Sequence, residues 1–145
     1  MRLRHGLAAS FIFTFWVIPA LAQVSSETTL AGYNHIPVVQ TPAIGFATIT
    51  IESDSLFIEG EFHDLRGVYR AAYVQYGKIG KSGHRMLRLK PEIAESITAG
   101  VFKKEENAFI LTDALRNSLR EGQLYINVTS NRHQLGEIRG QIPKM

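Results

Sequence analysis

The sequence has no cysteine among its 145 residues, which excludes disulfide bonds, thiolate metal ligands and a thiol nucleophile. The fold must therefore be held by side-chain packing and backbone hydrogen bonds alone. Small exported domains without disulfide bonds are more common in bacteria than in animal extracellular space. The absence of cysteine thus favours a bacterial periplasm or exterior.

Long hydrophobic runs are also scarce, and the one near the N-terminus is short. It covers about 13 residues, roughly Leu7 to Pro19, against the ~20 that a membrane-spanning helix needs. Arg2 and Arg4 precede it and Ala20-Leu21-Ala22 follows it, which is the order of a secretory signal peptide. We expect residues 1–22 to be removed after Ala22, leaving a secreted or periplasmic protein without stable membrane insertion. An uncleaved anchor is the alternative.

The chain has little excess charge of either sign. It carries 16 basic and 13 acidic residues, and removal of Arg2 and Arg4 leaves 14 against 13. Such a balance gives no argument for binding to nucleic acid or to an anionic membrane. The sequence also lacks internal repeats and low-complexity segments, so the chain after residue 22 is expected to form one domain.

What the sequence does contain is a series of short segments with alternating apolar and polar side chains. Residues 44–52 and 56–63 alternate in this way around Ser53-Asp54-Ser55, which predicts a β-hairpin. Further strands are expected at 68–76, 86–89, 97–101, 108–111, 124–129 and 136–142. The spacing predicts an all-β, immunoglobulin-like Greek-key sandwich or barrel of about seven to nine short antiparallel strands.

One short helix is expected near residues 112–121. Thr112 can cap its first turn, Leu115 and Leu119 share one face, and Gly122 can end it in a left-handed conformation. The polar residues 23–29 are expected to be flexible. These expectations leave residues 30–145 as the folded domain.

The C-terminal segment carries the most specific pattern. Gly122 to Val128 (GQLYINV), a short loop, and Gly136 to Ile142 (GEIRGQI) resemble the closing signature of CHRD (chordin-type) domains, G-x-L-Y-V-N-V-H-T followed by G-E-I-R-G-Q-L. Ala43–Ile51 resembles the opening element of that family, and Phe62–Gly67 resembles its F-x-x-L-x-G step. The similarity extends from about Leu30 to Ile142, as in a divergent, bacterial-type secreted member. It implies an immunoglobulin-like β-barrel or sandwich.

The resemblance implies less about activity. Animal chordins bind secreted growth factors, whereas the bacterial secreted members have largely unknown roles. Many members carry a His-x-His pair in the third strand and another histidine after the Asn-Val of the signature. Tyr73, Gln75 and Thr129 stand at these positions here. Histidines two apart on a strand share a face and suit a metal site or a proton relay. We therefore expect no metal and no cofactor in this chain.

Two groups of polar residues are candidates for a site. The first is expected to face a ligand and comprises Tyr73, Gln75, Tyr125, Asn127, Thr129 and His133. The second comprises Glu137, Arg139 and Gln141, which alternate on the last predicted strand. Glu137 and Arg139 share a face and could pair with each other. This second group could also bind a ligand, but we favour a partly buried network that fixes the hairpin register.

No catalytic residues are predicted. The sequence lacks a Gly-x-Ser-x-Gly elbow, and its histidines have no metal-ligand spacing. The expected function is a non-enzymatic secreted module that binds a protein or an extracellular polymer of unknown identity, with no nucleic-acid partner. One alternative is a metal-dependent enzyme on a superoxide-dismutase-like sandwich. Another is a structural envelope or matrix component that oligomerises by edge pairing.

Overall fold

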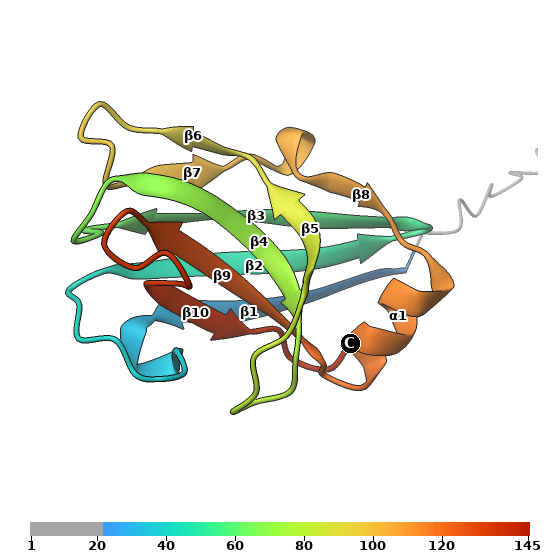
Figure 1. Cartoon of the computed structure of the whole chain (residues 1–145). Coiled ribbons are helices and arrows are strands. Elements are labelled where there is room, and N and C mark those ends of the chain that lie inside the picture. The colour runs from blue at the N-terminus through green and yellow to red at the C-terminus, as the bar shows by residue number, and fades with distance from the viewer. Residues whose placement is uncertain (1–21) are drawn as a thin grey trace, which may run out of the picture.

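An antiparallel sheet of ten strands dominates the computed structural model, which describes residues 22–145 (Figure 1). The strands are β1 (Gln23–Ala31), β2 (Ile44–Glu52), β3 (Ser55–His63), β4 (Tyr69–Tyr76), β5 (Arg85–Leu89), β6 (Pro91–Ile93), β7 (Gly100–Phe102), β8 (Ala108–Ile110), β9 (Leu124–Ser130) and β10 (Ile138–Gln141). One α-helix, α1 (Asp113–Arg120), and two short 3-10 turns, Gly32–Asn34 and Lys104–Glu106, complete the elements.

The sheet curls until it nearly closes into a barrel. Its strand order is β5-β4-β9-β10-β1-β2-β3-β7-β6, and β8 pairs with β3. β5 and β6 stand at opposite ends of this order although only Lys90 separates them in the chain. The chain therefore passes directly from one end of the sheet to the other, which brings those ends together. This architecture confirms the prediction of an all-β sandwich or barrel with one short helix.

The β2–β3 hairpin confirms the period-two prediction. Its ladder runs from Glu52 opposite Ser55 to Ile44 opposite His63, and Ile49 pairs with Ile58. Ile49 and Ile58 are both fully buried. Ser53 adopts a left-handed conformation with φ of 55°, which allows the tight turn between the strands. Local alternation was sufficient here because the two strands are adjacent in sequence.

Apolar side chains from the whole sheet and from α1 fill one core. Fully burying one such side chain stabilises the fold by about 1.5–3 kcal/mol. The largest fully buried members are Leu30, Ile49, Leu56, Ile58, Phe62, Leu89, Phe102, Leu119, Leu124, Ile126, Ile138 and Ile142.

α1 forms where the sequence predicts it. The Thr112 hydroxyl oxygen accepts a hydrogen bond of 3.3 Å from the backbone N–H of Leu115. Leu115 and Leu119 are buried on the face that packs on the core. Gly122 follows with φ of 65°, the conformation that ends a helix without a steric cost.

The start of the domain differs from the expectation that residues 23–29 are flexible. β1 begins at Gln23 and pairs with β2 at every position from Gln23 opposite Glu52 to Ala31 opposite Ile44. The side chains of its first half remain exposed or half-buried, so their polar character says nothing against a strand. The predicted signal peptide lies outside the described residues except for Ala22. No helix in the described range 22–145 is long and apolar enough to cross a membrane.

Asn107 connects the two ends of the sheet beside Lys90. Its side-chain oxygen accepts a 2.7 Å hydrogen bond from the backbone N–H of Lys90, and its amide donates to the carbonyl oxygens of Lys90 at 3.1 Å and Lys103 at 3.0 Å. Asn107 is fully buried. Within residues 22–145 no ladder joins β5 to β6. At this seam, the Asn107 side chain therefore ties Lys90, which links β5 to β6, to the segment that follows β7.

Tyr69 gives the fold a pH-sensitive element. Its ring stacks on Phe62 with the ring centroids 5.5 Å apart. Burial raises the pKa of the Tyr69 hydroxyl to about 12, and the nearby charge of Arg88 opposes this only in part. The folded protein therefore keeps the phenolic proton at a pH where the unfolded chain, with an ordinary pKa of about 10, has lost it.

Stability is therefore expected to fall as pH rises from about 10 to about 12, because the unfolded state releases the Tyr69 proton first. Tyr69→Phe keeps the ring and removes the hydroxyl, so the Tm of the wild type should fall relative to that of this variant across that range. Thermal unfolding followed by circular dichroism at about pH 9 and about pH 11.5 measures it. A constant difference would contradict the assignment.

Candidate functional site

The outer face of β4, β9 and β10 collects most of the residues that the sequence singles out. Tyr73 pairs with Asn127, Gln75 with Tyr125, and Gln141 with Tyr125. Ala72 and Val74 point into the core, so the alternating positions of β4 point away from it. Gln75, Tyr125 and Asn127 are nevertheless buried, because loops cover this face, whereas Tyr73 and Gln141 are half-buried.

The loop between β4 and β5, residues 77–84, provides one cover. The Gln75 side-chain amide donates to the Gly83 carbonyl at 3.0 Å, and the Tyr125 hydroxyl accepts from the Gly83 N–H at 3.2 Å. Gln141 donates to the carbonyls of Gly77 and Gly122, each at 2.9 Å. Three predicted binding or network residues therefore hold this loop against the barrel.

Arg139 lies beneath the same loop with 2% of its surface exposed. Its guanidinium lies 3.6 Å from the centre of the Tyr125 ring and donates to the Lys78 carbonyl and to Gln141 Oε1, each at 3.1 Å. Burial lowers the pKa of Arg139 from its ordinary value. None of the ion pairs among residues 22–145 includes Arg139. Carbonyl oxygens and an aromatic ring thus compensate this buried cation.

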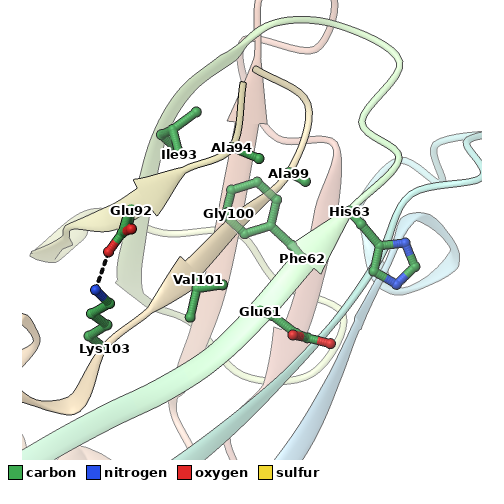
Figure 2. A pocket seen from close by; sticks show the side chains of 10 residues that line it. All are labelled: Glu61, Phe62, His63, Glu92, Ile93, Ala94, Ala99, Gly100, Val101 and Lys103. Carbon is green, nitrogen blue, oxygen red and sulfur yellow. Dashed lines mark ion pairs between the residues drawn. The ribbon is translucent and has the colours of Figure 1, made fainter. Parts of the chain in front are cut away.

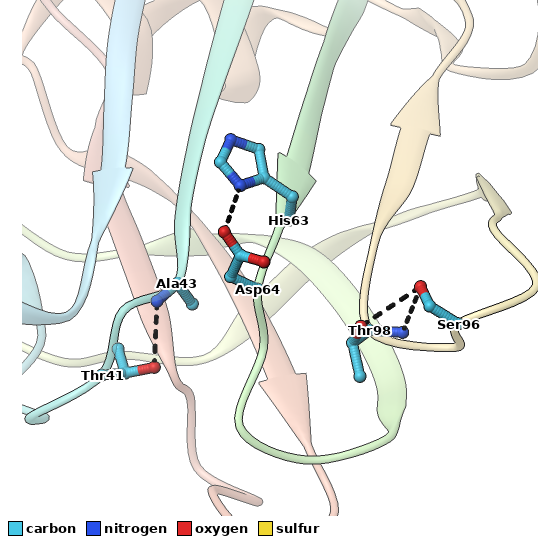
Figure 3. A network of polar contacts seen from close by, with 6 residues as sticks. All are labelled: Thr41, Ala43, His63, Asp64, Ser96 and Thr98. Carbon is cyan, nitrogen blue, oxygen red and sulfur yellow. Dashed lines mark hydrogen bonds and ion pairs between the residues drawn. The ribbon is translucent and has the colours of Figure 1, made fainter.

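Glu137 points to a different part of the structure and does not pair with Arg139. Its Oε1 accepts hydrogen bonds of 2.6 Å from the Thr41 hydroxyl and 2.6 Å from the backbone N–H of Arg66. Thr41 in turn accepts from the N–H of Ala43 at 3.1 Å (Figure 3). Glu137 is fully buried and joins the segment before β2 to the segment before β4. Glu137 and Arg139 thus do not form the possible pair. Each instead anchors a different loop segment.

Asn127 connects β9 to β4 and to the loop between β9 and β10. Its amide donates to Gln75 Oε1 at 2.6 Å and to the Leu135 carbonyl at 2.8 Å. Gly136 has φ of 145°, and a Cβ at this position would clash with Asn127 Oδ1. The signature therefore needs glycine here, because the buried amide occupies the space of a side chain.

The other predicted site residues do not take part in holding the loop between β4 and β5. The Thr129 hydroxyl donates to the Ala71 carbonyl at 3.0 Å and is buried. Tyr73 is half-buried, with the Arg85 guanidinium 4.2 Å from its ring centre. His133 lies in the loop between β9 and β10, where its backbone, but not its ring, bonds to Ser130. The structure thus unites Gln75, Tyr125, Asn127, Arg139 and Gln141 and leaves Thr129, Tyr73 and His133 beside them.

Tyr125, Asn127, Arg139 and Gln141 belong to the pattern that resembles the CHRD signature, and a comparison of the whole chain agrees with that resemblance. A family model for the CHRD domain matches residues 26–142. The chain belongs to the CHRD domain family. No curated protein and no solved structure matches this CHRD domain. In this member, the polar signature residues act as internal anchors for surface loops.

The CHRD domain has a hollow on its surface that the sequence did not predict. It has a volume of about 380 Å³ and lies between β3, β6 and β7 (Figure 2). Its lining residues are Glu61, Phe62, His63, Glu92, Ile93, Ala94, Ala99, Gly100, Val101 and Lys103. Phe62 can approach because Gly100 has no side chain: a Cβ there would lie 2.8 Å from the ring.

Charged groups stand at the rim of this hollow. Lys103 forms an ion pair with Glu92 on one side (Figure 2). On the other side His63 Nδ1 lies 2.8 Å from Asp64 Oδ2, and Asp64 has the left-handed φ of 62° that ends β3 (Figure 3). Among residues 22–145 no group of three or more His, Asp or Glu side chains is placed to hold a metal ion.

A second hollow adjoins the first on the outer face of β2, β3 and β7. It shares Glu61, Val101 and Lys103 with the first and extends to Phe46. Phe46 is 50% exposed and Val101 is 44% exposed. Large apolar side chains at outward positions of a strand are the signal that could have indicated this surface from the sequence. We call the two adjoining hollows, with Phe46 and Val101 at their surface, the apolar face.

Proposed function

We propose that this CHRD domain is an exported, non-enzymatic module that binds a protein or an extracellular polymer through its apolar face. The observation that carries the proposal is the pair of adjoining hollows bordered by Phe46 and Val101. The first has a volume of about 380 Å³, within the range of pockets that bury part of a ligand.

The buried polar side chains of β4, β9 and β10 are already bonded within the chain, so we expect the ligand to bind elsewhere. Gln75, Asn127 and Arg139 are buried, and the hydrogen bonds of their side chains go to strands and loops of the same chain. Side chains used in this way offer little to a ligand without first losing an internal bond, which costs about 1–3 kcal/mol each. Contacts to a partner must then come from exposed groups.

The apolar face combines the features of a recognition surface. Phe46 and Val101 can be desolvated by a partner, whereas the exposed carboxylates of Glu59 and Glu61 lie beside them. Apolar anchors within a polar rim are the usual source of affinity in protein interfaces. The proposed partner therefore offers an apolar group together with positive charge or hydrogen-bond donors.

The double substitution Phe46→Ser with Val101→Ser tests this proposal. Purified residues 23–145 are immobilised, and binding of proteins and polymers from the envelope and medium of the source cell is measured as saturable curves. We expect the double variant to lose at least about tenfold in affinity, the effect of removing two interface anchors.

The matched control is Ile110→Ser with Leu135→Ser, because Ile110 is 81% exposed and Leu135 is 85% exposed at other places on the surface. This control should bind as the wild type does. Equal losses in both double variants would show general surface stickiness. No saturable binding by the wild type would overturn the proposed function.

A further inference from the structure

Basic residues are strongly segregated in this chain. Residues 65–91 contain seven lysines and arginines and no aspartate or glutamate. All seven side chains are exposed. They are Arg66, Arg70, Lys78, Lys81, Arg85, Arg88 and Lys90. The near-neutral total charge of the domain therefore conceals one strongly positive region.

Five of these cations lie on β5, on the loop before it or directly after it, and we call Lys78, Lys81, Arg85, Arg88 and Lys90 the basic face. β5 crosses the front of the barrel in Figure 1. Leu89 is buried, so Arg88 and Lys90 on either side of it point outward, about 7 Å apart along the strand. Arg88 pairs with Tyr73, whose ring Arg85 covers at 4.2 Å.

None of the five cations has a carboxylate partner within 4 Å among residues 22–145. By contrast, Lys103 and Lys104, which follow β7, each form an ion pair, with Glu92 and Glu52. Unpaired like charges repel each other, and a bound polyanion would relieve that repulsion. The cations of the basic face thus lack the carboxylate partners that Lys103 and Lys104 have.

Polar side chains of β4 and β10 hold the loop that carries Lys78 and Lys81 in position. Arg139 donates to the Lys78 carbonyl, Gln141 to that of Gly77, and Gln75 to that of Gly83. With its backbone held at three points, the loop keeps Lys78 and Lys81 in a fixed segment that leads directly into β5. Such preorganisation lowers the entropic cost of binding.

We propose that the basic face binds an acidic polysaccharide, a chain that carries sulfate or carboxylate groups at regular intervals. The inference concerns a different surface from the apolar face and depends on the proposed function only for the extracellular location. A row of outward cations on a strand matches a linear polymer with repeated negative charges. Several weak contacts of this kind add along the chain.

The same surface is poorly suited to two other polyanions. Single-stranded nucleic acid binds through bases stacked on free aromatic rings, but Arg85 covers Tyr73 and His84 stacks on Tyr76 with the ring centroids 5.4 Å apart. An anionic membrane is bound by amphipathic segments with several apolar side chains. Among residues 77–90 Ile79 is the one large, mostly exposed aliphatic side chain.

To test this proposal, the affinity of residues 23–145 is measured for immobilised heparin and for polygalacturonate. Neutral dextran serves as the blank. The wild type should bind both acidic polymers at low salt and lose affinity as salt rises. Arg88→Gln with Lys90→Gln, and separately Lys78→Gln with Lys81→Gln, should each weaken binding roughly tenfold. Arg120→Gln with Lys144→Gln changes the net charge equally on α1 and the C-terminal tail and should have little effect.

Each other result has a definite meaning. No binding to either polysaccharide at low salt, or equal weakening by the control pair, would overturn the inference. So would equal or tighter binding to single-stranded DNA or to vesicles of anionic lipid. The Phe46→Ser with Val101→Ser variant should still bind heparin. Loss of partner binding in that variant with heparin binding intact separates the two surfaces, and failure of one leaves the other standing.

Discussion

Arg139→Ala is expected to lower the free energy of unfolding by about 2–4 kcal/mol. The substitution removes the guanidinium from the ring of Tyr125 and from the Lys78 carbonyl. It leaves Gln141 Oε1 without that donor and creates a space beneath the loop between β4 and β5. Urea unfolding of residues 23–145, followed by fluorescence and circular dichroism, measures the change. Amide exchange in residues 77–83 should also accelerate, because one anchor of the loop is gone.

Arg139→Met provides the matched comparison. Because the buried cation has no carboxylate partner, an apolar chain of similar length avoids its desolvation cost and still fills the space. The methionine variant should therefore lose clearly less stability than the alanine variant. Equal losses would mean that the hydrogen bonds to Lys78 and Gln141 outweigh packing. A fully stable alanine variant would contradict the anchoring role of Arg139.

Asn107→Ala is expected to cost about 2–3 kcal/mol, the second largest effect. The Asn107 side chain serves Lys90 N–H, the Lys90 carbonyl and the Lys103 carbonyl at the seam between β5 and β6. Alanine leaves these groups without their partner in a buried position. The same urea titration measures the loss, and amide exchange at Lys90 should report local opening of the seam.

Asn107→Asp tests the direction of the hydrogen bonds. Aspartate keeps an acceptor for the Lys90 N–H but places its second oxygen against two carbonyl oxygens. Near neutral pH it should therefore destabilise the domain at least as much as alanine does. A near-native aspartate variant would mean that water can satisfy the seam and that Asn107 does not close it.

The polar residues of β4, β9 and β10 show that outward positions on a strand can be either ligand-facing or buried under a loop. The sequence assigned Gln75 and Asn127 to a ligand-facing group and Arg139 to a separate polar network, whereas the strand register brings all three onto one face of β4, β9 and β10. It could not show that the loop at residues 77–84 returns over them. Since burial by a loop depends on contacts distant in sequence, alternation along a strand carries no information about it.

The overall charge of the chain was also an insufficient guide to its surface. A balance of 14 basic against 13 acidic residues in the segment 23–145 gave no reason to expect a polyanion partner. The distribution along the chain was nevertheless readable, because residues 65–91 hold no carboxylate. What the fold adds is that β5 and its loop present the cations on one exposed surface. The carboxylates of β2 and β3 lie on other strands, and Glu92 of β6 is paired with Lys103.

The sequence by itself determined the local elements: the β2–β3 hairpin, the capped helix α1 and the inward alternation of β9, each encoded by neighbouring residues. It also determined the family, through the glycines and buried polar groups of the C-terminal signature. Only the tertiary structure decided that polar β1 is a strand, that Asn107 joins the sheet ends, and that Phe46 and Val101 border a hollow. These features depend on partners far apart in the chain, because register, closure and covering loops are set by the packing of the whole barrel.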